Sequence, residues 1–271
     1  MNLAIGAATR VINNELGTWI QGASVMQKAA SIRDDLEANA LFLGQGETRV
    51  LLLSLDLATL PSDRAAAARE AIAQACGLPP TDIIIGCTHT HSGPSVVWTN
   101  YRKPVDDAYL DRLQGWLADL AREAVDAARP CRIGWASGQA RLGYNRRCCW
   151  ADGSHSMHGN ARRDDFTGLE GPDDPGQLVI YAEDADGNLV AVLHANTSHP
   201  VSFYGADFYS ADYPGAARQH LRAALGPIPV LYANGAFGDI TLCSQTAPRP
   251  NHEGREGRML RAAHILAGET L

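Results

Sequence analysis

Two histidines alternate with threonines shortly after a run of three isoleucines. His89 and His91 lie in the segment THTHSGP (residues 88–94), which follows the apolar residues 83–85. Residues two apart in an extended chain point to the same side, so both imidazoles can face one cavity. Imidazole is a common neutral ligand for zinc and related metals. The pattern predicts a metal site where a buried strand ends; the alternative is a pair of half-exposed polar histidines.

A third histidine follows a second apolar segment. His199 lies in NTSHP (residues 196–200), shortly after residues 189–194. Hydroxyl and amide side chains beside a histidine can hold its ring in one orientation. We therefore expect His199 to be a second metal ligand, the alternative being a structural histidine in a turn before proline. His194, inside the apolar segment, is expected to be packed.

Four further polar residues are candidates for the same site. Asp239 and Thr241 lie in the glycine-rich segment NGAFGDIT (residues 234–241), which permits close approach of backbone to a ligand. Asp239 is a candidate ligand, orienting carboxylate or base, and Thr241 a candidate substrate contact. Arg146 can clamp an anionic or carbonyl oxygen, although by sequence alone a surface position is favoured. Asp56 is either a helix cap or a partner of the site residues.

The remaining pattern indicates one α/β domain in which helices flank a mixed central sheet. The segment 146–175 is polar, charged and rich in glycine, and we expect an irregular loop that borders the site and is more mobile than the strands. The first helix should begin at Ser62, with its hydroxyl as the N-cap. Strands are expected at residues 3–7, 36–43, 49–57, 83–85, 131–136, 178–182, 189–194 and 229–233. Helices are expected at residues 62–76, 105–128, 214–225 and 253–267.

Bulk properties exclude several classes of protein. The chain has 271 residues and a formal net charge of −7, which argues against a broad basic surface for nucleic acid. No segment approaches the roughly 18–20 apolar residues of a transmembrane helix. The N-terminal residues do not have the pattern of a signal peptide, so we expect a cytoplasmic location.

The ordered motifs resemble the N-terminal catalytic domain of the neutral/alkaline (non-lysosomal) ceramidase family. The resemblance covers nearly all of residues 1–271, and THTHSGP is its most specific element. It implies zinc-dependent amide hydrolysis, with His89 and His199 as zinc ligands. It also implies that His91 contacts the substrate or the attacking oxygen and that Arg146 lies in the substrate pocket. The motifs that carry it are AIGAA (4–8), Leu51 with SLD (54–56), THTHSGP (88–94), YNR (144–146), TSHP (197–200) and NGAFGD (234–239).

The chain departs from the family pattern at two points. Thr241 stands where the family usually has a serine, which adds a methyl group to the pocket. The family's further zinc ligands, a glutamate and a tyrosine, come from a later region, and no position here matches them. We therefore expect a domain without the family's C-terminal part and an under-coordinated metal site. Another subunit or partner could supply the missing ligands, or Asp239 could substitute for them.

These observations predict a zinc-dependent hydrolase that cleaves an amide or ester bond in a small polar or lipid-like molecule. His91 or Asp239 would transfer protons, and Arg146 or Thr241 would stabilise the developing oxyanion. One alternative is a metal-dependent phosphoesterase, which would need more carboxylates near the histidines. The other is a non-catalytic binding or assembly domain, and homo-oligomers are compatible with any of these functions.

Overall fold

The computed structural model describes residues 3–22, 24–98, 103–247 and 254–271. Its main element is an eight-stranded sheet with the order β14-β12-β11-β6-β1-β3-β4-β5. The pairs β4–β5 and β12–β14 are parallel and the other pairs are antiparallel, which confirms the predicted mixed sheet. The strands are β1 (Ala4–Val11), β3 (Glu37–Gln45), β4 (Thr48–Leu55), β5 (Ile83–Cys87), β6 (Arg129–Gln139), β11 (Gly176–Asp184), β12 (Leu189–Asn196) and β14 (Val230–Asn234).

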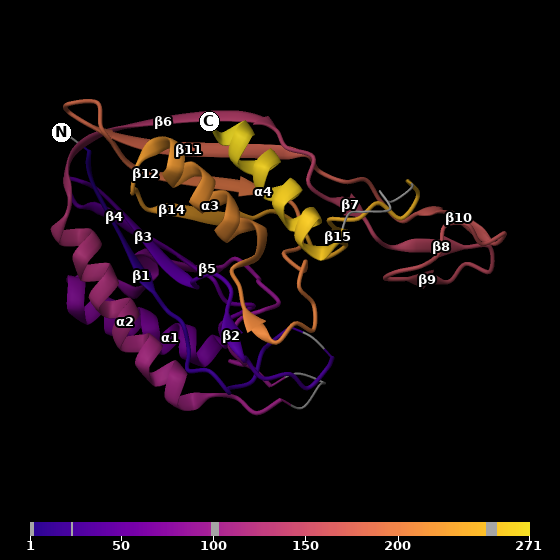
Figure 1. Cartoon of the computed structure of the whole chain (residues 1–271). Helices are drawn as coiled ribbons and strands as arrows, with labels where there is room; N and C mark the ends of the chain where they lie inside the picture. Colours follow the sequence, from indigo (N-terminus) through magenta and orange to yellow (C-terminus); the bar gives the residue numbers. More distant parts are fainter. Residues whose placement is uncertain (1–2, 23, 99–102, 248–253) are drawn as a thin grey trace.

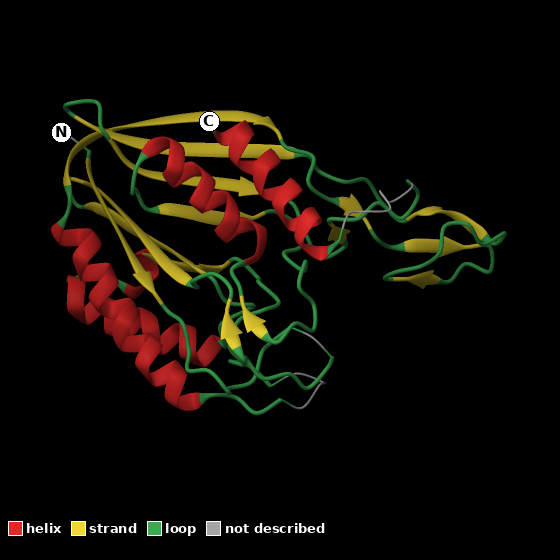
Figure 2. Ribbon diagram, viewed as in Figure 1, coloured by secondary structure: helices red, strands yellow, loops and turns green. Residues whose placement is uncertain are grey.

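Four helices cover the sheet, as Figure 2 shows. The helices are α1 (Ser62–Cys76), α2 (Asp107–Asp126), α3 (Asp212–Leu225) and α4 (Arg255–Thr270), with a short 3-10 turn at Pro80–Asp82. Helices α1 and α2 lie against β1, β3, β4 and β5, whereas α3 and α4 lie against β6, β11, β12 and β14 (Figure 1). This arrangement confirms the predicted α/β class. In the part of the chain that the structure describes, no helix is long and apolar enough to cross a membrane.

The sheet consists of two halves that are joined by only a short stretch of strand pairing. Strands β1 and β6 pair only through Ala4 with Pro130 and Ile5 with Arg129. The two halves also face one another, because the Ser54 hydroxyl on β4 donates to the Tyr232 carbonyl on β14 at 2.7 Å. Apolar side chains fill the space between them, so the ends of β5 and β12 lie close together although they belong to different halves. These side chains include Ile5, Leu41, Ala182, Val190, Ala191 and Leu231.

Helix boundaries agree with the predicted patterns, with one correction at a cap. Along α2, apolar residues three and four apart are buried, and Asp106 caps the helix by accepting from the Tyr109 amide at 2.9 Å. In α1, the N-cap position is Pro61 and no side chain caps the helix. The predicted Ser62 cap is therefore wrong, because Ser62 is already the first helical residue.

The segment 146–175 is not the irregular loop that its composition predicts. It contains a small antiparallel sheet of β8 (Cys148–Trp150), β9 (His155–Ser156) and β10 (Phe166–Leu169), which projects from the rest of the molecule in Figure 1. The Trp150 and Phe166 rings pack edge to face, with centroids 6.0 Å apart. Strands this short carry no readable alternation, so the composition alone concealed them. Two further two-stranded pairs join β2 (Ser31–Ile32) with β13 (Phe208–Tyr209), and β7 (Tyr144–Asn145) with β15 (Ile240–Thr241).

Candidate metal centre

Three imidazoles meet where β5 and β12 end. His89 and His91 follow β5, and His199 follows β12 in the other half of the sheet. One ring nitrogen of each lies within 4.8 Å of those of the other two, and the ring centroids are 4.7 to 4.9 Å apart. The three candidate histidines are therefore brought together. No aspartate, glutamate or cysteine among the described residues joins this group.

Backbone carbonyls determine which nitrogen of each ring carries the proton. The Nδ1 atom of His89 lies 2.5 Å from the Ala58 carbonyl oxygen, and that of His91 lies 2.6 Å from the Gly22 carbonyl oxygen. A carbonyl oxygen only accepts, so both Nδ1 atoms must donate. Each Nε2 atom then presents a lone pair. This is the orientation in which carbonyl groups commonly hold metal-binding histidines.

The third histidine has the same arrangement and faces the second one closely. The Nδ1 atom of His199 lies 3.3 Å from the Phe237 carbonyl oxygen, and its Nε2 atom lies 3.0 Å from Nε2 of His91. Nη2 of Arg146 lies 3.4 Å from the same Nδ1 atom, so the proton of this ring depends on which of the two neighbours it pairs with. With the proton on Nδ1, two lone pairs face one another between His199 and His91 and repel unless a cation lies between them. Burial lowers the pKa of His91 to about 4 and that of His199 to about 3, so neither ring carries a second proton near neutral pH. Zinc–nitrogen bonds of about 2.0–2.1 Å would place two ligand nitrogens roughly 3.3 Å apart, close to the separation of the His91 and His199 Nε2 atoms, and neutral imidazoles are donors that suit zinc.

The segment after β4 holds His89 in an unusual backbone conformation. His89 has a φ of 69°, a region that non-glycine residues rarely adopt without support from their surroundings. Its amide donates to the Leu57 carbonyl at 2.9 Å, and its ring donates to Ala58 in the same segment. The backbone that follows Asp56 therefore holds both the main chain and the ring of His89 in place.

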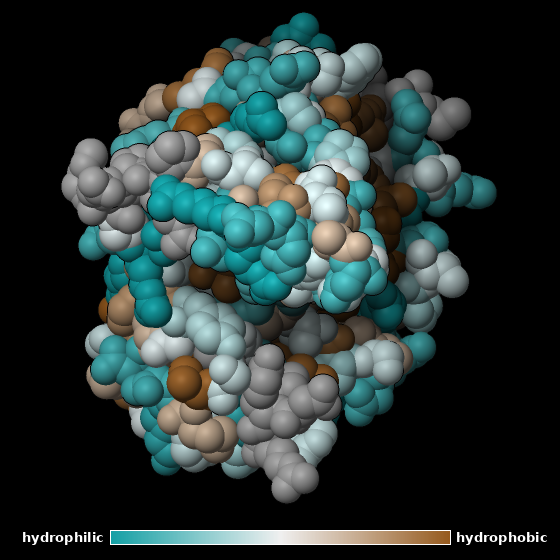
Figure 3. Space-filling view, turned by 90° about the vertical axis from the view of Figure 1, so that its right-hand side faces the viewer, coloured by the Kyte–Doolittle hydropathy of each residue, from teal (hydrophilic) through white to brown (hydrophobic). Residues whose placement is uncertain are grey.

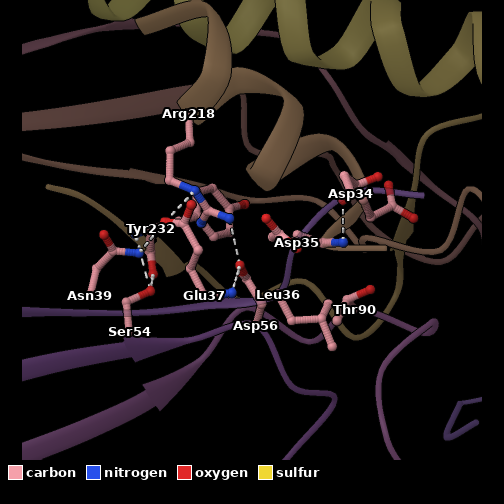
Figure 4. Close-up of polar contacts among 12 residues, drawn as sticks. Asp34, Asp35, Leu36, Glu37, Asn39, Ser54, Asp56, Thr90, Arg218 and Tyr232 are labelled. Atoms are coloured by element: carbon pink, nitrogen blue, oxygen red, sulfur yellow. Dashed lines mark hydrogen bonds and ion pairs between the residues drawn. The ribbon is translucent and has the colours of Figure 1, made fainter. Parts of the chain in front are cut away.

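A buried ionic cluster anchors this segment to α3, as Figure 4 shows. Oδ2 of Asp56 accepts from Nη2 of Arg218 at 2.6 Å and from the Glu37 amide at 2.9 Å. Arg218 also pairs with Glu37 at 3.1 Å, and Arg222 pairs with Glu37 at 2.7 Å. Burial by itself would raise the pKa of Glu37, but the two arginines outweigh it and hold that pKa below its ordinary value. Asp56 thus neither caps a helix nor touches the histidines, so both predicted roles are wrong.

The start of α3 and the residues just before it bind both histidine segments. The Tyr213 hydroxyl donates to the Ser198 carbonyl at 2.8 Å, next to His199. On the other side, the Thr90 hydroxyl donates to the Ser210 carbonyl at 2.6 Å, between His89 and His91. Residues that the sequence pattern did not single out therefore fix the relative position of the two motifs.

Arg146 lies beside the histidines and is buried, with 8% of its surface exposed. A surface position, favoured by sequence alone, is therefore wrong. Its Nη2 atom donates to the Gly238 carbonyl at 2.7 Å and lies 3.4 Å from Nδ1 of His199. Its Nε atom has no hydrogen-bond partner among the described residues. Burial lowers the pKa of this guanidinium.

The two candidates from the glycine-rich segment lie on the same side as Arg146. The Asp239 carboxylate accepts from the Asn145 amide group at 3.0 Å, and its backbone carbonyl accepts from the Arg146 amide at 2.8 Å. Asp239 does not join the three histidines. Thr241, on β15, is buried and lines a cavity together with Arg146.

This cavity has a volume of about 680 Å³; the three histidines do not line it, but residues that contact them do. Arg146 connects it to His199, and Tyr204 on its wall has its ring centroid 6.4 Å from that of His91. The segment 146–175 contributes Met157, among others, so this segment borders the site as predicted; its greater mobility stays a prediction. Figure 3 shows the side of the molecule from which that segment projects, a mainly hydrophilic face with a hollow across its middle.

His194 is fully buried and does not belong to the site. Its Nδ1 atom lies 3.1 Å from the Thr270 hydroxyl, and its ring packs edge to face on Tyr232. The expectation of a packed histidine is therefore confirmed.

Comparison with known proteins supports the fold. No family model and no curated protein matches the chain. A solved structure of neutral ceramidase from Pseudomonas aeruginosa matches it with a TM-score of 0.79 and 17% identity, over 100% of this chain and 44% of that chain. A ceramidase complexed with C2 matches with a TM-score of 0.78 and 17% identity, over 100% of this chain and 43% of that chain. The chain thus has a ceramidase-like fold and spans less than half the length of these structures.

Proposed function

We propose that this chain is a zinc-dependent hydrolase that cleaves an amide or ester bond. One observation carries the proposal: His89, His91 and His199 each place one ring nitrogen within 4.8 Å of the other two, while their Nδ1 atoms lie beside backbone carbonyls. Neutral imidazoles oriented in this way form a metal-binding donor set. When bound, zinc would acidify a water molecule and polarise the carbonyl group of the substrate.

We assign all three histidines as ligands, which modifies the expectation that His91 contacts the substrate. The 3.0 Å separation of the Nε2 atoms of His91 and His199 supports this, because a substrate contact would not require it. Three protein ligands are the usual number in a catalytic zinc site, where the fourth position stays open. A further ligand from another segment or subunit would tighten the site.

Arg146 is placed to bind the carbonyl oxygen on which negative charge develops. It combines a buried guanidinium, an unpartnered Nε–H group and a position beside His199. A donor fixed before the reaction stabilises an oxyanion without reorganising. We assign Thr241 as a second polar contact in the cavity, and Asp239 as a positioning residue that holds Arg146 through its backbone carbonyl.

The substrate is proposed to be a small amide or ester. The matched structures are named ceramidases, which suggests amide hydrolysis, although the likeness is one of fold at 17% identity. A phosphoesterase site is less well supported, because no carboxylate of the described residues joins the histidines.

The test is metal content followed by turnover of the full 271-residue chain. We expect one zinc per chain and hydrolysis of simple amides or activated esters, both lost in His89→Ala. His264→Ala, an exposed histidine on α4, is the matched control and should change neither. A chain that does not bind zinc under these conditions would overturn the proposal and favour a non-catalytic domain.

A further inference from the structure

The cavity beside the histidines differs in charge from the rest of the molecule. The whole chain has 30 acidic and 23 basic residues and a net charge of −7. The described residues that line the cavity, however, include Arg146 and Arg258, and none of them is an aspartate or glutamate. A cationic cavity in an acidic protein favours ligands of negative charge.

Arg146 supplies a second observation that points the same way. Its guanidinium is more than nine-tenths buried and pairs with the Gly238 carbonyl, while its Nε–H group has no partner among the described residues. The Asp239 carboxylate accepts from Asn145 and is not among the residues that line the cavity. A buried cation without a paired carboxylate gains most from an anionic ligand.

We infer that the cavity binds a substrate that carries an oxyacid anion, a carboxylate or phosphate, a few bonds from the amide or ester that is cleaved. The inference rests on the proposed hydrolase function and adds a substrate class to it. Arg146 lies at the histidine end, where the bond would be cleaved, and Arg258 comes from the first turn of α4. The volume of about 680 Å³ suits a small molecule that reaches from one to the other.

The experiment compares charged and neutral members of matched substrate pairs on the zinc-loaded chain. The first pair is N-acetylglycine and N-acetylglycinamide; water cleaves the acetyl C–N bond and yields acetate with glycine or glycinamide. The second pair is N-acetyl-phosphoethanolamine and N-acetylethanolamine, so the two pairs distinguish carboxylate from phosphate. We expect kcat/KM to be at least about tenfold higher for the charged member of one pair, the scale of one charge-assisted contact.

Substitutions on the cavity wall test the assignment. Arg258→Gln should bring the ratio of kcat/KM for the charged and the neutral substrate close to one, and Arg258→Lys should retain part of the preference for the charged substrate. Gln245→Glu adds a carboxylate to the same wall without removing an arginine and should also reduce the preference. The control is Arg255→Gln, an exposed position one turn earlier on α4 that does not line the cavity and should leave the preference intact.

A binding measurement separates this inference from the proposed function. Levulinate, in which a ketone CH₂ group replaces the amide N–H of N-acetylglycine, cannot be hydrolysed, and levulinamide is its neutral counterpart. Arg258-dependent binding of levulinate without any amide turnover would support the anion site and contradict the hydrolase. Turnover of amides with equal kcat/KM for charged and neutral members, and no preference for levulinate, would overturn the inference and leave the hydrolase standing.

Discussion

Arg218 and Arg146 are both almost completely buried, with 3% and 8% of their surfaces exposed, yet their surroundings differ. Arg218 lies between the carboxylates of Asp56 and Glu37. Arg146 contacts the Gly238 carbonyl and a neutral histidine. Burial lowers the pKa of an arginine, but the two carboxylates reverse this for Arg218 and raise its pKa, whereas the pKa of Arg146 stays lowered.

The comparison separates a cation that holds the fold together from one that is available for a ligand. The charge of Arg218 is neutralised by carboxylates inside the protein, so its removal would leave those carboxylates buried and unpaired and would lower the stability of the folded state. The charge of Arg146 faces a cavity, so its removal should chiefly affect what binds there. Four predictions are given in order of decreasing expected effect, and the first and the last test this difference directly.

The largest effect is expected for Arg218→Met. Removing one partner of a buried ion pair leaves unpaired charge, which typically costs about 3–5 kcal/mol of unfolding free energy. Urea unfolding of the zinc-free protein measures this loss, with Arg146→Met as the matched substitution. If both variants lose the same stability, the two arginines do not differ in the way we propose.

The histidine cluster gives the next largest effect. Both His89→Ala and His91→Ala should weaken zinc binding by about 100-fold or more, because each removes one of three ligands. Competition with a chelator of known affinity measures the binding. If His91→Ala abolishes turnover while zinc affinity is retained, His91 contacts the substrate and is not a ligand.

Asp212 offers a buried carboxylate without an arginine partner. Burial raises its pKa from 3.8 to about 6, although the Ser202 hydroxyl and amide and the Tyr213 amide donate to it. The folded state therefore binds a proton more tightly than the unfolded state, so this group's contribution to stability is greatest below pH 4 and is lost as the pH rises to about 6.

Asp212→Asn should remove that pH dependence, which amounts to about 2 kcal/mol between pH 4 and pH 6. Asparagine tolerates the φ of 57° at this position. The measurement is the difference in unfolding free energy between wild type and variant at each pH, which cancels the other titrating groups. A difference that does not change with pH would show that Asp212 is ionised in the same range in both states.

The smallest effect is expected for Arg146→Lys. Lysine keeps the charge but loses the planar donor group, so kcat should fall about tenfold while zinc affinity and stability stay close to those of wild type. Steady-state kinetics with zinc titration check this. A parallel loss of zinc affinity would mean that Arg146 acts by holding His199.

Much of the architecture was predictable from local patterns. The apolar periodicity of α2 and the hairpin of β11 and β12 are properties of short segments, and the spacing of His89 and His91 places both rings near one strand end. The pattern failed at residues 146–175, where β8, β9 and β10 are too short for alternation to show. It also failed at Asp56, whose partners Glu37 and Arg218 lie 19 and 162 residues away.

The sequence by itself determined which residues can bind a metal and that each motif follows a strand. Only the tertiary structure decided that His199 meets His91, because the two lie 108 residues apart and in different halves of the bent sheet. It also decided what surrounds each ring, since the sequence does not show that the carbonyls of Gly22, Ala58 and Phe237 meet these imidazoles. A backbone carbonyl is the same group in every residue, so only folding determines which imidazole it holds.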